Sequence, residues 1–447
     1  MKYTVPTQVS KALSLLNEAG YEAYVVGGAV RNLVMGIPVN DWDITTSAMP
    51  EQTKFVFEDY KTIDTGLKHG TVTVIIDSMH LEVTTFRIDS DYSDKRRPDE
   101  VSFTSSLSED LSRRDFTCNA LAFSPDKGIV DLFGGISDIE NKTIRCVGNP
   151  DKRFNEDALR ILRALRFSSV LGFNIDDSTS ESIFRNYKLL DYISNERIFT
   201  EISKIICGIN VRTILTDYSD VIFYVIPELK PMSGCNQNHE RHIFDVWGHT
   251  VETVCSIRNT PDLRFAMLFH DCGKPVVKTT DENGVDHFYR HALISADISG
   301  KVLSRLKTSN SFRKEVVNLV RYHDFLPNVI SRKTYRKYLG LLGKETLYKL
   351  FEVREADIRG QNPVFLNQEL ENNKTGLAVL EEIINSNDCV NIHDLAINGS
   401  DLITLGFESS PEIGKIINIL FEEVISDKTV NEKNALIKRA KEIHNVN

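Results

Sequence analysis

YVVGGAVRNLVMGIPVNDWD, residues 24–43, is the stretch of this chain that decides its fold. An apolar run, Tyr24 to Val26, ends at Gly27-Gly28 and is followed by helix-forming residues. A strand that breaks at two glycines and restarts as a helix directs backbone N–H groups and the positive helix end at one point. Arg31 adds a fixed positive charge. The alternative is a plain tight turn, but the residues that follow favour a site for a triphosphate.

The second half of this stretch carries two acidic residues, Asp41 and Asp43, on either side of Trp42. On an extended segment, residues two apart share a face, so both carboxylates can hold the same divalent cations. Mg²⁺ favours carboxylate oxygens together with substrate phosphates. Asp-x-Asp alone is also typical of a solvated loop or a helix cap. Its position after a phosphate-type loop favours magnesium-dependent nucleotide chemistry.

Further candidates for the same site lie downstream. In HLEVTTFR, residues 80–87, strand alternation predicts that Glu82 faces the same way as Thr84, so a neighbouring strand can bring it beside the two aspartates. The alternative for Glu82 is a cross-strand ion pair. In LSRRDFTCNA, residues 111–120, Arg114 can bind a phosphate and Asp115 or Asn119 a ribose hydroxyl. The alternative there is that these residues stabilise the start of a helix.

The composition is that of an ordinary globular protein. The chain has 447 residues, 41% of them hydrophobic and 26% charged, which predicts about two to four domains. Its net charge of −10 argues against indiscriminate coating of nucleic acid but leaves local basic patches possible as RNA contacts. Its seven cysteines form no CxxC pair, which favours a reducing compartment. No apolar run approaches the roughly 18 residues of a membrane span, so a cytoplasmic protein without a membrane partner is expected.

The patterns along the chain predict an α/β head followed by helical domains. Strands are expected at Tyr24–Val26, Thr71–Ile76, Leu81–Arg87 and Ile129–Leu132, after a helix over residues 6–19. The polar stretch from Asp89 to Phe103, which includes Arg96-Arg97-Pro98, is expected to form an exposed, mobile loop. From about residue 150 the periodicity is helical, which predicts an all-α remainder.

A helix is expected from Arg153 to Phe167, with Leu162 and Leu165 on its apolar side. Asp157 and Arg160 stand one turn apart and together offer an acceptor and a donor for the hydrogen-bonding edge of a base. A simple salt bridge between them is the alternative. The arginines at 160, 163 and 166 are more than such a bridge needs, which favours nucleotide selection without a nucleic-acid template.

These segments together resemble a known family. The strings GGAVRNLVMGIPVNDWDITTSA, TGLKHGTVTV, LEVTTFR, RRDFTCNAL, DLFGGISDIENKTIR and RFNEDALRILRALRF, in this order, are similar to the class II tRNA nucleotidyltransferases, which are the CCA-adding enzymes and their poly(A) polymerase relatives. The resemblance spans roughly residues 20 to 230. It implies a multidomain protein with a polymerase-β-like mixed-sheet head, then helical neck, body and tail.

The resemblance also implies roles for single residues. Asp41 and Asp43 would hold the metal, with Glu82 as the supporting carboxylate. The triphosphate and ribose would lie at Gly28, Arg31 and Arg114. Asp157 and Arg160 would act as the protein template for the incoming base, with Arg163 and Arg166 also lining the nucleotide site, and Asn195-Glu196-Arg197 with Glu201 resembles the helix-end motif that follows. One departure is Asn32, because most relatives carry aspartate there, and an ion pair that would orient Arg31 is therefore in doubt.

A second set of metal-ligand residues lies in the helical half. His270-Asp271 is adjacent in sequence, with His249 upstream and His291 and His323-Asp324 downstream, a set that can supply mixed nitrogen and oxygen ligands to a transition metal or Mg²⁺. Any one of these histidines alone is more often buried for structural reasons. The set resembles the HD phosphohydrolase superfamily, which implies His249, His270, Asp271 and Asp324 as ligands of one ion and His291 and His323 for a second.

The predicted function is therefore that of a CCA-adding enzyme, which acts on tRNA with CTP and ATP. The expected parts are a head at 1–145, a neck and body at 146–235, an HD domain at 236–345 and a tail at 346–447. The alternatives are an enzyme that adds only the terminal A, a poly(A) polymerase, or an HD-domain phosphohydrolase as the main activity. A complete loop at residues 89–103 favours terminal A addition, as the resemblance implies.

Overall fold

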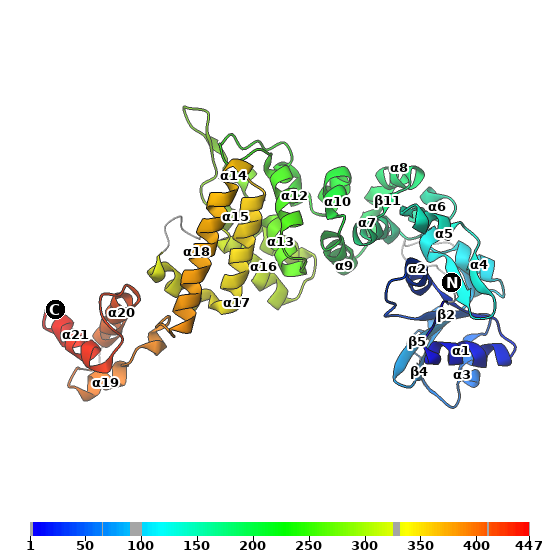
Figure 1. The fold of residues 1–447 in the computed structure, drawn as a ribbon, viewed down its shortest axis with the longest axis horizontal. Coiled ribbons are helices and arrows are strands. Elements are labelled where there is room, and N and C mark those ends of the chain that lie inside the picture. The colour runs from blue at the N-terminus through cyan, green and yellow to red at the C-terminus, as the bar shows by residue number, and fades with distance from the viewer. Residues whose placement is uncertain (1–2, 65, 90–100, 325–330, 409–410, 447) are drawn as a thin grey trace. The chain divides into compact units, whose positions relative to one another are not determined.

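The computed structural model describes residues 3–64, 66–89, 101–324, 331–408 and 411–446. They form two compact units, Met1–Pro227 and Glu228–Asn447 (Figure 1). The expected division into four parts is finer than this one and stays a prediction. The centre of the loop expected between Asp89 and Phe103, with Arg96-Arg97-Pro98, lies outside the described residues.

A seven-stranded mixed sheet forms the centre of the N-terminal unit, and each strand expected from the sequence overlaps one of its strands. β2 and β5 are parallel, whereas the other neighbouring pairs of this sheet are antiparallel. The mixed-sheet head is therefore confirmed. In order across the sheet, the strands are β3 (Lys61–Ile63), β4 (Thr71–Ile76), β5 (Met79–Thr85), β2 (Asp43–Thr46), β1 (Ala23–Val26), β8 (Leu121–Ser124) and β9 (Gly128–Asp131).

Alternating burial explains how helices cover this sheet. In β4, Val72, Val74 and Ile76 are fully buried and alternate with partly exposed residues, the pattern of a strand with one face in the core. Helix α1 packs on β1, and α3 packs on β4 and β5 (Figure 1). The other elements of the head are β6 (Arg87–Asp89), β7 (Val101–Phe103), η1 (Leu67–His69), η2 (Thr117–Asn119) and the helices α1 (Thr7–Glu18), α2 (Gly28–Met35), α3 (Pro50–Val56), α4 (Leu107–Ser112) and α5 (Gly135–Glu140).

The single helix expected from Arg153 to Phe167 is wrong, because the chain breaks there into two helices. Asp157 has extended backbone angles, φ −134° and ψ 104°, and its Oδ1 accepts a hydrogen bond from the Leu159 N–H at 3.0 Å. Aspartate competes in this way with helical hydrogen bonding and favours helix starts. The helical part of this unit consists of α6 (Pro150–Glu156), α7 (Leu159–Leu171), α8 (Asp177–Asn186), η3 (Tyr187–Tyr192), α9 (Asn195–Ile206), α10 (Val211–Asp217) and α11 (Ser219–Val225), with β10 (Thr143–Ile144) paired to β11 (Asn174–Ile175).

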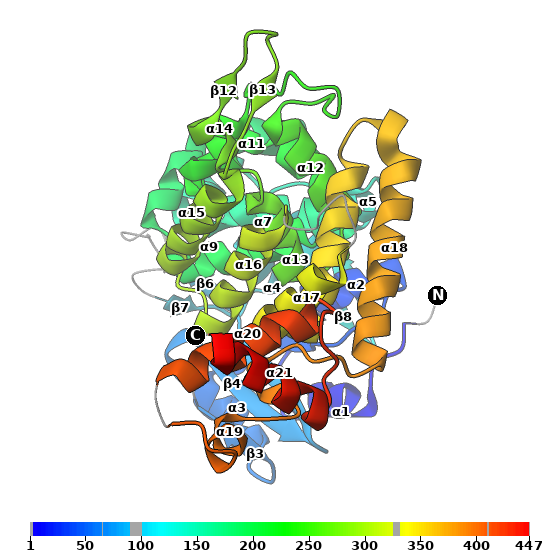
Figure 2. The ribbon, with the colours of Figure 1, turned by 90° about the vertical axis from the view of Figure 1, so that its left-hand side faces the viewer.

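The C-terminal unit is helical, as expected, apart from one short hairpin. Strands β12 (Thr279–Thr280) and β13 (Asp286–His287) pair antiparallel, and the hairpin projects beyond α14 and α15 (Figure 2). Strands of two residues are too short to show an alternating pattern, so the sequence did not reveal them. The helices are η4 (Pro227–Met232), α12 (Val246–Ser256), α13 (Pro261–Phe269), α14 (Lys274–Val277), α15 (His291–Arg305), α16 (Asn310–Tyr322), α17 (Arg332–Arg359), η5 (Pro363–Phe365), α18 (Leu366–Asn385), η6 (Ile392–Asp394), α19 (Gly399–Thr404), α20 (Pro411–Ile425) and α21 (Lys433–Val446).

The basic start of α17 holds the end of the chain in place. Lys333 and Lys337 both pair with Glu422 of α20, at 2.9 Å each. Arg336 is buried and pairs with Asp388, which follows α18. These cations are therefore engaged within the unit. Among the described residues, every helix is too short or too polar to cross a bilayer.

Gly340 of α17 tests how tightly α17 packs against the segment that follows α18. A Cβ at this position would lie 2.2 Å from the Val390 carbonyl oxygen, so Gly340→Ala is expected to lower the free energy of unfolding by about 1–3 kcal/mol. Gly414→Ala is the matched control, because a Cβ in α20 would meet nothing within 4 Å and alanine favours helix by about 0.5–1 kcal/mol. Urea unfolding followed by circular dichroism measures both. Equal midpoints for the two variants would contradict the close approach.

Candidate functional site

A turn between β1 and α2 forms the floor of the N-terminal site. Gly27 has φ 71° and ψ −134°, angles that side chains other than glycine rarely adopt, and α2 begins at Gly28. A Cβ at Gly27 would lie 3.1 Å from Nη1 of Arg114. The missing side chain therefore lets the Arg114 guanidinium lie against the turn, as expected for a shared phosphate site.

The pairing of β2 with β5 brings acidic side chains together beside this turn. In the parallel register Asp43 stands opposite Glu82, and Asp41 precedes β2 by two residues. Burial, and then the charges of Asp41 and Glu82, raise the pKa of Asp43 to about 6. The nearby charges of Asp41 and Glu82 disfavour ionisation of Asp43, and a bound cation would relieve this repulsion. Their oxygen-only donor set fits a divalent ion such as Mg²⁺.

A cavity of about 460 Å³ is lined by Asp43, whereas Asp41 and Glu82 are exposed and are not among its lining residues. Seven arginines and three aspartates are among the residues that line it, so its walls favour a polyanion. Of the residues expected to bind nucleotide, six line the cavity: Gly28, Arg31, Arg114, Asp157, Arg160 and Arg163. Arg166 is not among the lining residues, and its Nη1 pairs with the buried Glu201 at 2.9 Å.

Two amide side chains orient Arg31 in the cavity wall. Nη1 of Arg31 donates to Asn119 Oδ1 at 2.6 Å, while Nε and Nη2 donate to Asn32 Oδ1 at 3.2 and 2.9 Å. The neutral Asn32 amide thus orients Arg31 by hydrogen bonds where most relatives would offer an ion pair. Burial lowers the pKa of Arg31. Arg31 therefore keeps a fixed direction without a carboxylate at this position.

Asp115 positions a second arginine. Both Nε and Nη2 of Arg163 donate to Asp115 Oδ2, the first at 2.8 Å, and Asn119 donates to Asp115 Oδ1 at 3.2 Å. Burial alone would raise the pKa of Asp115, but Arg163 lowers it to about 2. Asp115 and Asn119 therefore brace the arginines of the cavity. This is a bracing role that the sequence patterns did not indicate for them.

Asp157 and Arg160 both line the cavity, but each has its own partner. Asp157 Oδ2 lies 3.4 Å from Nη2 of Arg197, in the expected helix-end motif. Arg160 donates to Glu156 Oε2 and to the Arg113 carbonyl, both at 2.8 Å. The two side chains are thus fixed separately. This arrangement leaves an acceptor and a donor group at the cavity wall for a base edge.

Asp110 is a residue of this site that the sequence patterns missed. It is fully buried, and its Oδ1 accepts hydrogen bonds from Nε and Nη2 of Arg113, while its Oδ2 accepts one from Nη2 of Arg114 at 3.2 Å. Thr45 of β2 contacts the same carboxylate at 3.4 Å. One buried charge therefore connects the strand of Asp43 with the arginine at the phosphate turn. Its position three residues before Arg113 was the only local signal.

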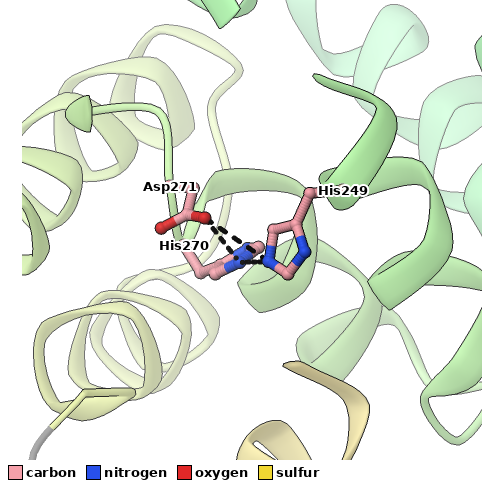
Figure 3. A group of neighbouring side chains, drawn as sticks. All are labelled: His249, His270 and Asp271. Atoms are coloured by element: carbon pink, nitrogen blue, oxygen red, sulfur yellow. Dashed lines mark hydrogen bonds and ion pairs between the residues drawn. The ribbon is translucent and has the colours of Figure 1, made fainter. Parts of the chain in front are cut away.

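The C-terminal unit gathers four histidines around one aspartate, each from a different part of the helical bundle. His249 (α12), His270 and Asp271 (after α13) can hold one ion, and Asp271 with His291 (α15) and His323 (after α16) can hold another. Oδ2 of Asp271 lies 3.1 Å from His270 Nε2, and Oδ1 lies 3.3 Å from His291 Nε2 (Figure 3 shows the first group). Asp271 is therefore shared by both groups.

The backbone hydrogen bonds of the imidazole rings direct their Nε2 atoms toward one another. Each of the four histidines has its Nδ1 within 3.0 Å of a backbone carbonyl, so Nδ1 carries the proton. The Nε2 lone pairs then face one another, at 3.2 Å between His249 and His270 and 3.1 Å between His291 and His323. Two such nitrogens repel each other unless a proton or a metal cation lies between them. Cations between them fit this donor set of nitrogen and carboxylate oxygen.

Asp357 of α17 completes the first group. Its Oδ1 lies 2.9 Å from His249 Nε2 and 3.7 Å from His270 Nε2. The sequence patterns assigned this position to Asp324, which is exposed and lines the mouth of a cavity of about 340 Å³. Asp357 was missed because no adjacent histidine marks it. Asp271, His291, His323 and Asp357 line the same cavity, so the second group is reachable from solvent.

Family models match three parts of the chain. Residues 23–145 match a poly(A) polymerase head domain, residues 172–231 an RNA and SrmB binding site of polymerase A, and residues 287–440 a tRNA nucleotidyltransferase domain 2. Among curated relatives, the CCA-adding enzyme of Streptococcus suis is 34% identical over 98% of both chains. That of Lactobacillus helveticus is 36% identical over 95% of this chain and 94% of the relative.

Solved structures show the same fold. The CCA-adding enzyme of Bacillus stearothermophilus in complex with CTP covers 99% of both chains with 29% identity and a TM-score of 0.68. The Thermotoga maritima CCA-adding enzyme complexed with tRNA covers 99% of this chain and 97% of that chain, with 19% identity and a TM-score of 0.61. At 19% identity, the similarity to the Thermotoga maritima enzyme shows the fold alone.

Asp110→Asn tests the brace behind the cavity arginines. Loss of this buried charge leaves Arg113 and Arg114 without their shared counter-ion, so unfolding is expected to become easier by about 2 kcal/mol or more and CTP affinity to fall about tenfold. Calorimetric titration with CTP measures the affinity. Asp138→Asn is the control, because Asp138 is equally buried but pairs with Thr117 and Arg145 outside the cavity lining. Unchanged CTP affinity in Asp110→Asn would contradict the bracing role.

Proposed function

The chain belongs to the family of CCA-adding enzymes, and from this premise we propose that it adds C, C and A to the 3′ end of tRNA from CTP and ATP at the N-terminal cavity. The observation that carries this proposal is that Asp43, whose pKa is raised in part by the charges of Asp41 and Glu82, lines a cavity together with seven arginines. The 3′-hydroxyl oxygen forms a bond to the α-phosphorus, the bond to the β-phosphate oxygen breaks, and pyrophosphate leaves while the hydroxyl proton passes to solvent.

The residues of the cavity divide this work. Arg31 and Arg114 hold the triphosphate, since both line the cavity next to the Gly27-Gly28 turn. Asp157 and Arg160 read the base, because a wrong base leaves their hydrogen bonds unmet. Asp41 and Asp43 would hold Mg²⁺, with Glu82 in support. When bound, Mg²⁺ supplies charge neutralisation for pyrophosphate and a lower pKa for the attacking hydroxyl.

We place the reaction in the cytoplasm. All seven cysteines are free in the described structure, and none of the described helices offers a membrane anchor. Free cysteines suit a reducing compartment.

Asp41→Ala tests the polymerase site. Purified protein with Mg²⁺ should add CTP and then one ATP to tRNA that lacks CCA, and Asp41→Ala should lower the rate by at least about a thousandfold because the metal loses a ligand. Asp59→Ala, a change of an exposed aspartate in the same unit, should leave the rate intact. Primer extension on tRNAs that end before C, after CC and after CCA measures each step. Extension only of tRNA ending in CC would indicate an A-adding enzyme, and long A tails a poly(A) polymerase.

A second function is favoured by the four facing imidazole nitrogens and the shared Asp271. We propose that this HD-type centre holds two divalent or transition-metal ions and hydrolyses phosphate esters. His249, His270 and Asp357 would hold one ion and His291 and His323 the other, with Asp271 between them. Bound ions supply Lewis acidity toward the phosphate oxygens. Hydrolysis adds the oxygen of water to phosphorus, breaks the ester bond and gives the alcohol and inorganic phosphate.

Metal content tests this second site independently of turnover. Protein incubated with Mn²⁺ and desalted should carry two ions per chain in this unit, Asp271→Asn should lose both, and His291→Ala should lose one, because only Asp271 belongs to both groups. CCA addition should remain in each variant. His393→Ala, a change of an exposed histidine, is the control. Elemental analysis and hydrolysis of p-nitrophenyl phosphate are the measurements, and equal metal content in all variants would refute the site.

A further inference from the structure

The β12–β13 hairpin borders the cavity of the histidine-aspartate centre. His287 and Tyr289 line this cavity together with His291 and His323 (Figure 2 shows the hairpin). Tyr289 is only two residues from His291, so their Cα atoms are at most about 7 Å apart. Both residues line the same cavity, so one small ligand can contact Tyr289 and His291 together.

Buried contacts hold the hairpin in one position. Asp286 is only 5% exposed, and it accepts hydrogen bonds from the Asn238 N–H at 2.8 Å and from Thr280 Oγ1 at 2.7 Å. Lys278 Nζ lies 2.8 Å from the same carboxylate. This anchoring makes the hairpin a preformed wall of the cavity.

Two aromatic rings stand on this wall. The rings of His287 and Tyr289 stack, with centroids 5.5 Å apart and an angle of 9° between their planes. Asp281 Oδ2, 3.0 Å from His287 Nε2, fixes the histidine ring. Tyr289 is 70% exposed although tyrosine usually buries most of its ring. An aromatic ring that is held in one orientation and exposed at a cavity mouth is a surface on which a nucleic-acid base can stack.

Positive charge lies next to the rings. Arg290, in the left-handed region at φ 63°, is exposed and lines the cavity directly between Tyr289 and His291. Lys274 also lines the cavity and lies 2.7 Å from Asp271. Three consecutive residues at this cavity therefore supply an aromatic ring (Tyr289), a positive charge (Arg290) and a proposed metal ligand (His291).

We propose that the His287–Tyr289 pair is a base-binding platform, so that the histidine-aspartate centre selects phosphate esters that carry a base over esters that lack one. This inference rests on the proposed phosphohydrolase function. The substrate class is a nucleoside phosphate, either free or at the end of an RNA. Stacking does not depend on the identity of the base, so adenine and cytosine are bound alike.

AMP and ribose 5-phosphate test this platform, since they differ only in the base. With the Mn²⁺-loaded full chain, kcat/KM for AMP should exceed that for ribose 5-phosphate, and Tyr289→Ala should lower the AMP value about 5- to 100-fold through KM, leaving ribose 5-phosphate unchanged. Tyr289→Phe should retain the preference. Tyr192→Ala is the matched control, because Tyr192 is an exposed tyrosine of the other unit. A short RNA with a 3′-terminal phosphate, assayed beside AMP, distinguishes an RNA end from a free nucleotide.

Equal use of the two compounds by the wild type, or equal losses for both in Tyr289→Ala, would overturn the platform. If neither compound is hydrolysed, the phosphohydrolase proposal fails and the platform is judged by binding. AMP is then titrated calorimetrically into Mn²⁺-loaded wild type and Tyr289→Ala. Since Tyr289 is outside the unit of the polymerase cavity, the difference between the two isotherms reports the hairpin alone. A weaker isotherm for the variant supports the platform, and identical isotherms refute it.

Discussion

Groups that repel one another lie close together in both candidate sites of this protein: charged side chains in the N-terminal unit and imidazole nitrogens in the C-terminal unit. The structure around each site depends on the neighbouring groups that offset this repulsion. In the N-terminal unit, the charges of Asp41 and Glu82 act on Asp43 at the β2–β5 pair, and seven arginines line the adjoining cavity. In the C-terminal unit, four imidazole nitrogens converge on Asp271. Both arrangements place like groups close together, which disfavours them unless neighbouring groups or ligands compensate. A cation would relieve the repulsion among the carboxylates and imidazole nitrogens, and a polyanion would relieve that among the arginines.

The two units offset this repulsion with different groups. The N-terminal cavity uses charged and amide side chains: Asp110 holds Arg113 and Arg114, and Asp115 holds Arg163. The C-terminal centre uses backbone carbonyls, each of which accepts the Nδ1–H of one histidine. Side-chain braces fix the direction of each arginine while the rest of its guanidinium group faces the cavity. Backbone braces fix the imidazole nitrogens rigidly, which suits permanent metal ligands.

Local periodicity explains what could be predicted from the sequence. The two-residue repeat of a strand predicted that Asp41 and Asp43 share a face, and the pairing of β5 with β2 sets Glu82 opposite Asp43. Asp357 could not be predicted, since its partner His249 lies 108 residues away in the chain and meets it only through helix packing. The break at Asp157 depends on a single side-chain hydrogen bond that outweighs a helical pattern on both sides. Features that depend on one residue or on contacts between distant segments produce no periodic sequence pattern, so the sequence does not predict them.

Asn32 shows how a neutral residue can serve in place of a charged one. The Pro38 carbonyl lies 3.3 Å from Asn32 Nδ2 and accepts its hydrogen bond, which turns Oδ1 toward Arg31. An aspartate would orient Arg31 equally well but would also cancel part of its charge at hydrogen-bond distance. With the amide, direction comes from Asn32 and Asn119, while the full positive charge of Arg31 stays available to an anion. Since burial already disfavours the charged form of Arg31, the gain on meeting a triphosphate is correspondingly larger.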